Sequence, residues 1–315
     1  MLGFAGRRLL YLVPVLIAVT LLTFLIAALL PGDLAIALLA DEATPEKVAA
    51  LRHEMGFDEP LAWQYLHWLG SALAGDFGRS FRTGEMVLSA ILQRLPVTLE
   101  LMLFAQLIAL AIGVPLGILC AVRNGGAFDR LMTAIAFGKL SLPAYMLAIV
   151  LIYVFSVRLK LLPATGYVPL NEDIVGNLRS FVLPAVTLGF GEWPVLMRVL
   201  RSDMTTLQED YIAMARAKGL RPWSILLVHA LKPSSLTLVT VTGIGIGRLI
   251  GGAVLVETIF ALPGIGRLLI GAINARDFAI MQGVVLFVAT GFVLVNFVVD
   301  VLYGVLDPRI RHGRS

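Results

Sequence analysis

The sequence predicts an all-α integral membrane protein with six transmembrane helices. Hydrophobic residues make up 58% of its 315 residues and charged residues only 15%, whereas soluble domains carry about a quarter charged residues. A helical span needs roughly 20 mostly apolar residues. Six segments meet this requirement: 9–30, 97–121, 132–156, 181–200, 234–256 and 283–305. This composition excludes an ordinary soluble globule.

The basic residues that flank these spans predict that both termini lie in the cytoplasm. In that orientation 13 Lys and Arg residues lie in inside segments and ten in outside segments. Five of those ten lie in the long loop 31–95, and long loops count for little in the positive-inside rule. The first span follows Arg7-Arg8 and is longer than a signal peptide's apolar region, so we expect it to be retained.

The outer loop is predicted to hold two short amphipathic helices. One begins with Thr44 as its cap and Pro45 in its first turn, and the other begins at Pro60. Three aromatic residues of the second helix favour the membrane–water interface: Trp63, Tyr65 and Trp68. Two interpretations remain open, a helical cap over the outer mouth that contacts a partner and a surface-lying helix pair that anchors the loop.

The cytoplasmic stretch 201–233 predicts a short helix suited to docking. Acidic residues lie early in this stretch and basic residues late, which matches the helix dipole. Gly219 can end the helix in a left-handed conformation, and Pro222 prevents its continuation. The side chains between them are small or apolar, so the helix could fit a groove of another protein. The alternative is an ordinary loop helix that lies on the membrane.

This stretch resembles the coupling loop, or EAA loop, of binding-protein-dependent ABC importer permeases. The family pattern is Glu-Ala-Ala, three residues and then Gly, and Ala215 and Gly219 stand in those places, whereas Ala213 replaces the generic Glu. The stretch from Glu209 to Leu220 is more similar to the coupling loop of the dipeptide/oligopeptide/nickel branch than to the general family pattern. Motifs similar to that branch run along the chain: Arg7-Arg8-Leu9-Leu10, Leu30-Pro31-Gly32-Asp33, Asp76-Phe77-Gly78-Arg79-Ser80-Phe81, Leu95-Pro96-Val97-Thr98-Leu99-Glu100, Glu257-Thr258-Ile259-Phe260 and Leu306-Asp307-Pro308-Arg309-Ile310-Arg311.

The resemblance implies the B-type permease subunit of a peptide-family importer in a bacterial inner membrane, with the ABC type-1 permease fold. It implies four partners besides the bilayer: a homologous second permease, two ATP-binding subunits and an external substrate-binding protein. The chain would form half of the pathway for peptides or related small solutes and work by alternating access. The residues expected to couple to the ATPases are Glu209, Asp210, Tyr211, Ala213, Ala215, Arg216, Ala217, Lys218 and Gly219.

The expected domain organisation has four parts. They are an N-terminal span (1–31), an external loop (32–93), the type-1 transmembrane domain with the coupling loop (94–307) and a cytoplasmic tail (308–315).

Missing motifs predict that the chain is not an enzyme. It has no G-x-x-x-x-G-K-[ST] loop for phosphates, its four His are scattered without metal-ligand spacing, and no catalytic set is visible. ATP and Mg²⁺ are therefore expected on the partner ATPases. The basic residues sit at span ends, so no nucleic acid is expected as a partner. The alternative function is a stand-alone secondary transporter or channel, which would need a midplane ion site or inverted repeats.

Three charged residues in or near the spans are candidates for the pathway: Glu192, Arg248 and Glu257. A charge at a helix centre costs about 2.5–3.5 kcal/mol on insertion scales, so it usually faces protein or water. Ion pairs between helices are the alternative. Gly243, Gly247 and Gly251 recur every four residues and predict a close helix–helix contact. That contact could slide during gating or pack statically.

Overall fold

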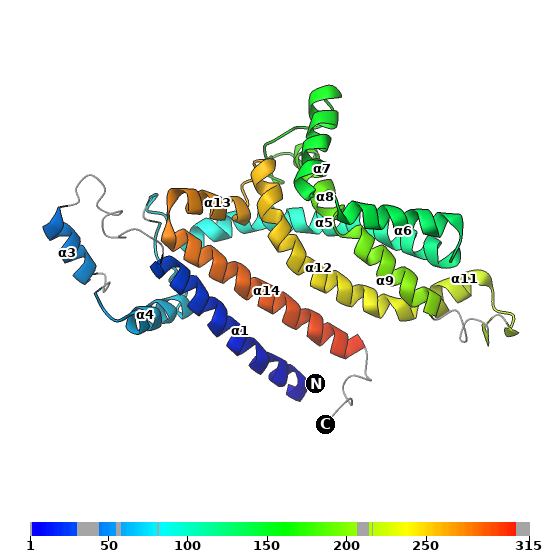
Figure 1. Ribbon diagram of the computed structural model, residues 1–315, viewed down its shortest axis with the longest axis horizontal. Helices are drawn as coiled ribbons and strands as arrows, with labels where there is room; N and C mark the ends of the chain where they lie inside the picture. The colour runs from blue at the N-terminus through cyan, green and yellow to red at the C-terminus, as the bar shows by residue number, and fades with distance from the viewer. Residues whose placement is uncertain are drawn as a thin grey trace. The chain divides into compact units, whose positions relative to one another are not determined.

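The computed structural model describes residues 2–29, 44–54, 58–80, 82–206, 214–215 and 217–306. Helices dominate these residues (Figure 1). In chain order they are α1 (Leu2–Leu29), α3 (Pro45–Glu54), α4 (Leu61–Leu73), α5 (Val87–Val122), α6 (Ala127–Leu140), α7 (Ala144–Leu151), the π-helix η2 (Ile152–Arg158), α8 (Ile174–Gly189), α9 (Trp193–Thr206), α11 (Pro222–Ser224), the π-helix η3 (Ile225–Leu231), α12 (Lys232–Ile259), α13 (Ile265–Ala275) and α14 (Phe278–Leu306).

The predicted all-helical class is confirmed, whereas the count of six spans and their orientation stay predictions. Among the described residues, three helices are long and apolar enough to cross a membrane: Val87–Val122, Pro222–Ile259 and Phe278–Val299. Two bent helix pairs raise the number to five if each pair is one span. The predicted first span falls in α1, whose apolar stretch Leu12–Leu25 is shorter.

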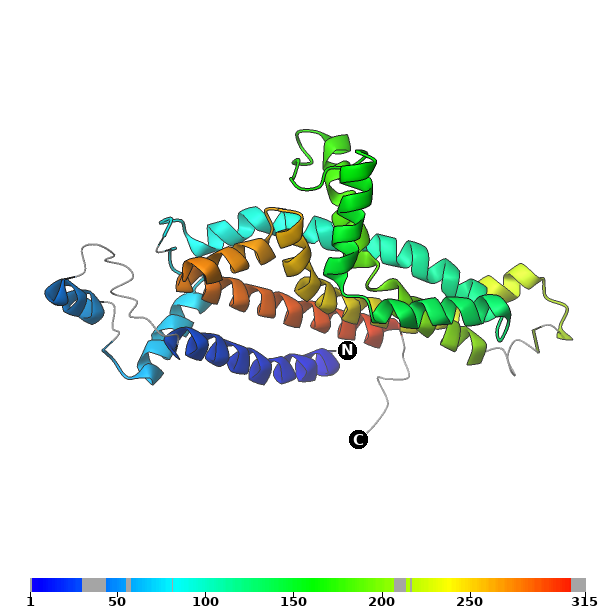
Figure 2. The same ribbon diagram turned by 45° about the horizontal axis from the view of Figure 1, so that its top comes forward.

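The third predicted span is broken rather than continuous. Its two parts, α6 and α7, are bent by 99° (Figure 2). The break covers Ser141 to Pro143. Proline has no N–H to donate and its ring disfavours a helical conformation at the preceding residue, so the helix ends there and a new one begins.

The fourth predicted span is also broken, with α8 and α9 bent by 53°. The break covers Phe190 to Glu192. Just before it, Gly189 lies so close to α5 that a Cβ there would overlap the carbonyl oxygen of Ala105. Glycine permits this contact because it has no side chain. The helix therefore ends against α5, and Glu192 enters the interior of the protein at the turn.

A π-helix precedes Pro233, which lies at the start of α12. Proline inside a continuous helix removes one hydrogen bond, and its ring clashes with the carbonyl four residues earlier. The wider winding of η3 over Ile225–Leu231 lets the stretch from Pro222 to Ile259 continue as one helical segment.

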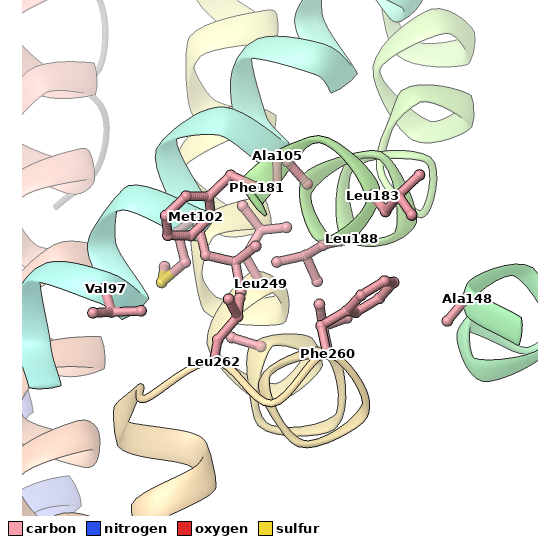
Figure 3. Close-up of a cluster of buried hydrophobic side chains, with 14 residues drawn as sticks. Val97, Met102, Ala105, Ala148, Phe181, Leu183, Leu188, Leu249, Phe260 and Leu262 are labelled. Atoms are coloured by element: carbon pink, nitrogen blue, oxygen red, sulfur yellow. The ribbon is translucent and has the colours of Figure 1, made fainter. Parts of the chain in front are cut away.

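The chain divides into two compact units, and the larger comprises Met1–Arg7, Leu95–Arg267 and Leu294–Ser315. Its main apolar core joins α5, α7, α8 and α12 (Figure 3). Phe181, Leu249 and Phe260 are almost fully buried there. This core holds α8 and α12 together close to the break at Glu192.

The smaller unit comprises Arg8–Arg94 and Leu268–Val293 and contains the outer-loop helices. Both predicted helices are present: α3 begins at Pro45 as predicted, and α4 begins at Leu61, one residue after the predicted start at Pro60. Tyr65 of α4 hydrogen-bonds Thr20 of α1 at 2.8 Å, and Phe24 lies 5.6 Å from the Tyr65 ring. Trp68 packs on Phe24 as well. The loop helix is thus anchored to α1, whereas Trp63 of the same helix is exposed.

A buried polar clasp fixes the turn before α5 within this unit. Ser80 Oγ donates a 2.5 Å hydrogen bond to Asp277, and the N–H groups of Arg82 and Thr83 donate to Ser80 Oγ. The other Asp277 oxygen accepts from the N–H of Ile280 in the first turn of α14. Ser80 and Asp277 are both buried, so one carboxylate holds both the turn and a helix start.

Candidate functional site: a polar cluster at the helix breaks

Glu192 and Arg248 form a two-point ion pair inside the larger unit. Arg248 Nε donates to Glu192 Oε1 at 3.1 Å and Nη2 donates to Oε2 at 2.6 Å. Paired parallel bonds of this kind are strong and fix the relative geometry of the two groups. The sequence indicates each residue separately as a pathway candidate. In the structure the two residues are paired, with Glu192 at the α8–α9 break and Arg248 in the middle of α12.

Gly245 leaves the space that this cluster occupies. A Cβ placed on Gly245 would lie 3.1 Å from Glu192 Oε2, 3.5 Å from Arg248 Nη2 and 3.9 Å from Gln106 Oε1. Gln106 belongs to α5, and its Oε1 is buried without a hydrogen-bond partner. Most buried polar atoms are hydrogen-bonded, so an unsatisfied acceptor beside an ion pair requires an explanation.

A second cation, Lys139, extends the cluster toward the other helix break. Its Nζ lies 6.0 Å from the centre of the Phe190 ring, and Glu192 attracts its charge. A Cβ on Gly191 would lie 3.5 Å from the same Nζ. Both broken helices therefore contribute charged groups to one place, and ionisable residues inside a membrane often mark a substrate or ion pathway.

Arg248 faces an open side of α12. Its side chain is 45% exposed, against 10% for Glu192. Ile244, Gly251 and Leu255 are exposed on the same side, at helical spacing. A guanidinium in this position is costly against lipid. The open side of α12 therefore suits water or another polypeptide better than acyl chains.

Glu257, the third predicted pathway residue, has a different environment. It is fully buried. Thr98 Oγ1 donates to its Oε1 at 2.7 Å, and the N–H of Arg267 donates to its Oε2 at 3.1 Å. The N–H of Ile265 donates to Thr98 Oγ1 at 2.9 Å. Glu257 thus accepts hydrogen bonds at the first turn of α13, and no ion pair to it is found among the described residues.

The three predicted packing glycines do not share one contact. A Cβ on Gly243 would overlap the side chain of Val299 in α14, so α12 lies close to α14 at this glycine. At Gly251 a Cβ would meet nothing within 4 Å. Gly247 is half-buried. A role of Gly247 and Gly251 in packing against another subunit stays a prediction.

The predicted coupling segment is described in part. Glu209, Asp210, Tyr211, Ala213 and Arg216 lie outside the described residues. Ala215 is buried in a cluster of its own chain with Ala121, Leu200 and Met204, whereas Ala217 and Lys218 are exposed.

The end of this segment has the geometry that the sequence predicts. Gly219 has φ +73°, and the N–H of Leu220 donates to the carbonyl of Ala215 at 3.3 Å. Together these features form a left-handed helix end of the Schellman type. Pro222 then begins the next helix.

Sequence reasoning missed an ion pair near this segment. Arg201 of α9 binds both carboxylate oxygens of Asp129 at the start of α6, and its Nη2 also donates to Asn124 at 3.1 Å. Asp129 is 2% exposed. The contact joins the α5–α6 turn to the helix that precedes the coupling segment. No motif signals it, because each residue reads as an ordinary flanking charge.

The chain matches the family described as "Binding-protein-dependent transport system inner membrane component" over residues 113–312, and that family's N-terminal model over residues 1–102. It is 40% identical to the dipeptide transport system permease protein DppB of Escherichia coli (strain K12) over 339 aligned residues that cover all of both chains. The chain belongs to this family of ABC importer permeases.

Other relatives agree with this assignment. The di/tripeptide transport system permease protein DppB of Pseudomonas aeruginosa (strain UCBPP-PA14) is 40% identical and fully covered. Among solved structures, a chain of the MetNI methionine ABC transporter in inward-facing conformations matches with a TM-score of 0.57 at 19% identity, covering 69% of this chain and 95% of that one. The family match decides against the stand-alone secondary transporter.

Proposed function

We propose that this permease forms half of the translocation pathway of an ATP-driven importer for short peptides in a bacterial inner membrane, and that it works by alternating access. The observation that carries the proposal is full-length similarity to permeases named for dipeptide and di/tripeptide transport. The polar cluster at the two helix breaks supports it, because a polar solute needs polar groups where it crosses the membrane.

The proposal includes the predicted topology and domains. Six spans have both termini in the cytoplasm, residues 1–31 form the first span, 32–93 the external loop, 94–307 the type-1 domain and 308–315 the tail. The anchoring of α4 on α1 supports an outer loop held at the membrane surface. Alkaline phosphatase fused after Gly84 should be active and fused after Gly219 inactive, and the opposite pattern would reverse the orientation.

The energy for transport comes from other subunits in this proposal. A homologous second permease completes the pathway, two ATPases bind ATP and Mg²⁺, and an external binding protein delivers the solute. The coupling residues 209–219 contact one ATPase. The exposed side chains of Ala217 and Lys218 and the defined helix end at Gly219 support this contact.

Purification and reconstitution test the proposal. The permease, expressed with the genes of its transport system and extracted in mild detergent, should co-purify with a second permease and an ATP-binding subunit. In proteoliposomes the complex should take up Ala-Ala only with ATP and the binding protein. Uptake that persists without the ATPase subunit, or a complex that takes up no short peptide, would refute the proposal.

A further inference from the structure

Three features of the Glu192–Arg248 cluster point to a ligand rather than to a static ion pair. The guanidinium of Arg248 is half-exposed on the open side of α12. Glu192 is nearly buried, and its carboxylate is the only anion within hydrogen-bond distance of Arg248 among the described residues. The adjacent Gln106 Oε1 is a buried acceptor without a partner. The cluster thus holds an accessible cation, a carboxylate and an unused acceptor.

Helix packing alone does not require these groups. An ion pair that only held the α8–α9 break to α12 would need neither a half-exposed guanidinium nor a buried acceptor left without a partner beside it. Replacing both partners by apolar residues of similar shape would also serve packing. Gly245 instead keeps open the space into which Glu192, Arg248 and Gln106 converge.

The chemistry of the cluster matches a small zwitterion. The carboxylate of a solute can replace Glu192 as the bidentate acceptor from the Arg248 guanidinium, because the two carboxylates have the same geometry. An ammonium group donates three hydrogen bonds, and the released Glu192 oxygens and Gln106 Oε1 are the acceptors available to it. One ligand with both groups satisfies all three side chains together.

We propose that Glu192, Arg248 and Gln106 form a binding site within the membrane for the charged termini of a zwitterionic solute, with the Glu192–Arg248 pair as its resting state. Arg248 takes the carboxylate of the solute, and Glu192 with Gln106 takes its ammonium. The inference rests on the proposed import of short peptides and adds where in the chain such a solute is recognised.

The test uses the complete importer in proteoliposomes with saturating binding protein and Ala-Ala as the probe. Arg248→Gln is expected to lower the maximal uptake rate about tenfold to a hundredfold, as loss of hydrogen bonds to a charged group predicts. Half-maximal stimulation of the ATPase by the binding protein should occur at the wild-type concentration. Arg158→Gln is the matched control, because Arg158 is an exposed arginine of η2 bonded to Tyr153 outside the cluster.

Gln106→Leu separates binding from stability. A purely structural glutamine with an unsatisfied oxygen can be replaced by leucine without loss of stability, so the melting temperature should stay at or above that of the wild type. Uptake should nevertheless fall about tenfold, as loss of one hydrogen bond to an ammonium predicts. Wild-type uptake by this variant would overturn the proposal, even if Arg248→Gln fails to assemble.

The charge-swapped variant Glu192→Arg/Arg248→Glu is a second test of whether the pair serves packing or binding. It restores the ion pair but puts the anion on the open side of α12. If the pair serves packing, the swap restores uptake lost in the single variants and overturns the proposal. If it serves binding, assembly returns and uptake does not. A wild-type importer that takes up no Ala-Ala refutes the proposed function itself, whereas equal uptake by wild type and variants refutes this inference alone.

Discussion

Replacing Glu257 by glutamine should loosen the first turn of α13 while leaving the shape of the side chain unchanged. Glu257 is fully buried, with Thr98 Oγ1 donating to one carboxylate oxygen at 2.7 Å and the N–H of Arg267 donating to the other at 3.1 Å. An amide presents one oxygen and one NH₂ to these two donors. If the amide oxygen faces Thr98, the N–H of Arg267 faces the NH₂ group and loses its acceptor. If the amide oxygen faces Arg267, the NH₂ group can donate to Thr98 Oγ1, but the hydroxyl proton of Thr98 loses its acceptor.

The size of the effect follows from that lost bond. Leaving one buried donor unsatisfied costs about 1–3 kcal/mol. At about 2–4 °C for each kcal/mol in domains of roughly 150–250 residues, a loss of about 2 kcal/mol lowers the melting temperature by about 4–8 °C. Glu257→Ala should lower it further, because it also leaves a cavity.

Two assays on the detergent-solubilised complex check this expectation. Thermal unfolding reports the stability, and trypsin reports the local opening, because Arg267 lies in the first turn of α13. Cleavage after Arg267 should become faster in Glu257→Gln. The exposed Glu172 provides the control Glu172→Gln, which should change neither measurement. If Glu257→Gln matched this control in both, the carboxylate would not be what holds the start of α13.

Three further predictions follow from packing, charge and backbone geometry. Gly189→Ala places a Cβ against the backbone of α5 and should lower the free energy of unfolding by about 1–3 kcal/mol, measured by thermal unfolding. The control Gly251→Ala, whose Cβ meets nothing within 4 Å, should stay within about 0.5 kcal/mol of the wild type. Arg201→Gln leaves the buried Asp129 carboxylate without its ion pair and should lower the free energy of unfolding by about 3–5 kcal/mol. The double variant with Asp129→Asn should recover most of that loss, and no recovery would contradict the pairing. In Gly219→Ala the alanine must adopt φ near +73°, a conformation that costs about 1–2 kcal/mol for a residue with a Cβ. The variant should take up less solute per ATP hydrolysed, and an unchanged ratio of uptake to hydrolysis would argue against coupling through this helix end.

Apolar runs and turn chemistry could be predicted from the sequence because they depend on neighbouring residues. The outer-loop helices begin at Pro45 and one residue after Pro60, and Gly219 has the left-handed conformation that a helix end requires. The breaks at Ser141–Pro143 and Phe190–Glu192 were not predicted. A window of mean hydropathy does not register a change of helix direction, and Pro143 could equally have produced a kink within one span.

The polar contacts could not be predicted because their partners are distant in sequence. Glu192 and Arg248 are 56 residues apart and Thr98 and Glu257 are 159 residues apart, so hydropathy marks each charge as unusual without indicating its partner. Only the glycines that follow Glu257 in the sequence could have indicated where its carboxylate lies. A Cβ on Gly264 would overlap the Glu257 carboxyl group, so the Gly-x-Gly pattern reflects a carboxylate that needs room.

The half-exposed guanidinium of Arg248 also bears on how this permease is made. If a second permease covers the open side of α12 as proposed, a newly inserted chain that lacks it would present that side to the bilayer, with 45% of the Arg248 side chain uncovered. Lipid solvates a guanidinium poorly, so an orphan subunit is less stable in the membrane than an assembled one. Membrane proteases preferentially degrade chains that open easily. In the proposed assembly we therefore expect copies of this chain that lack the second permease to be degraded faster than assembled copies.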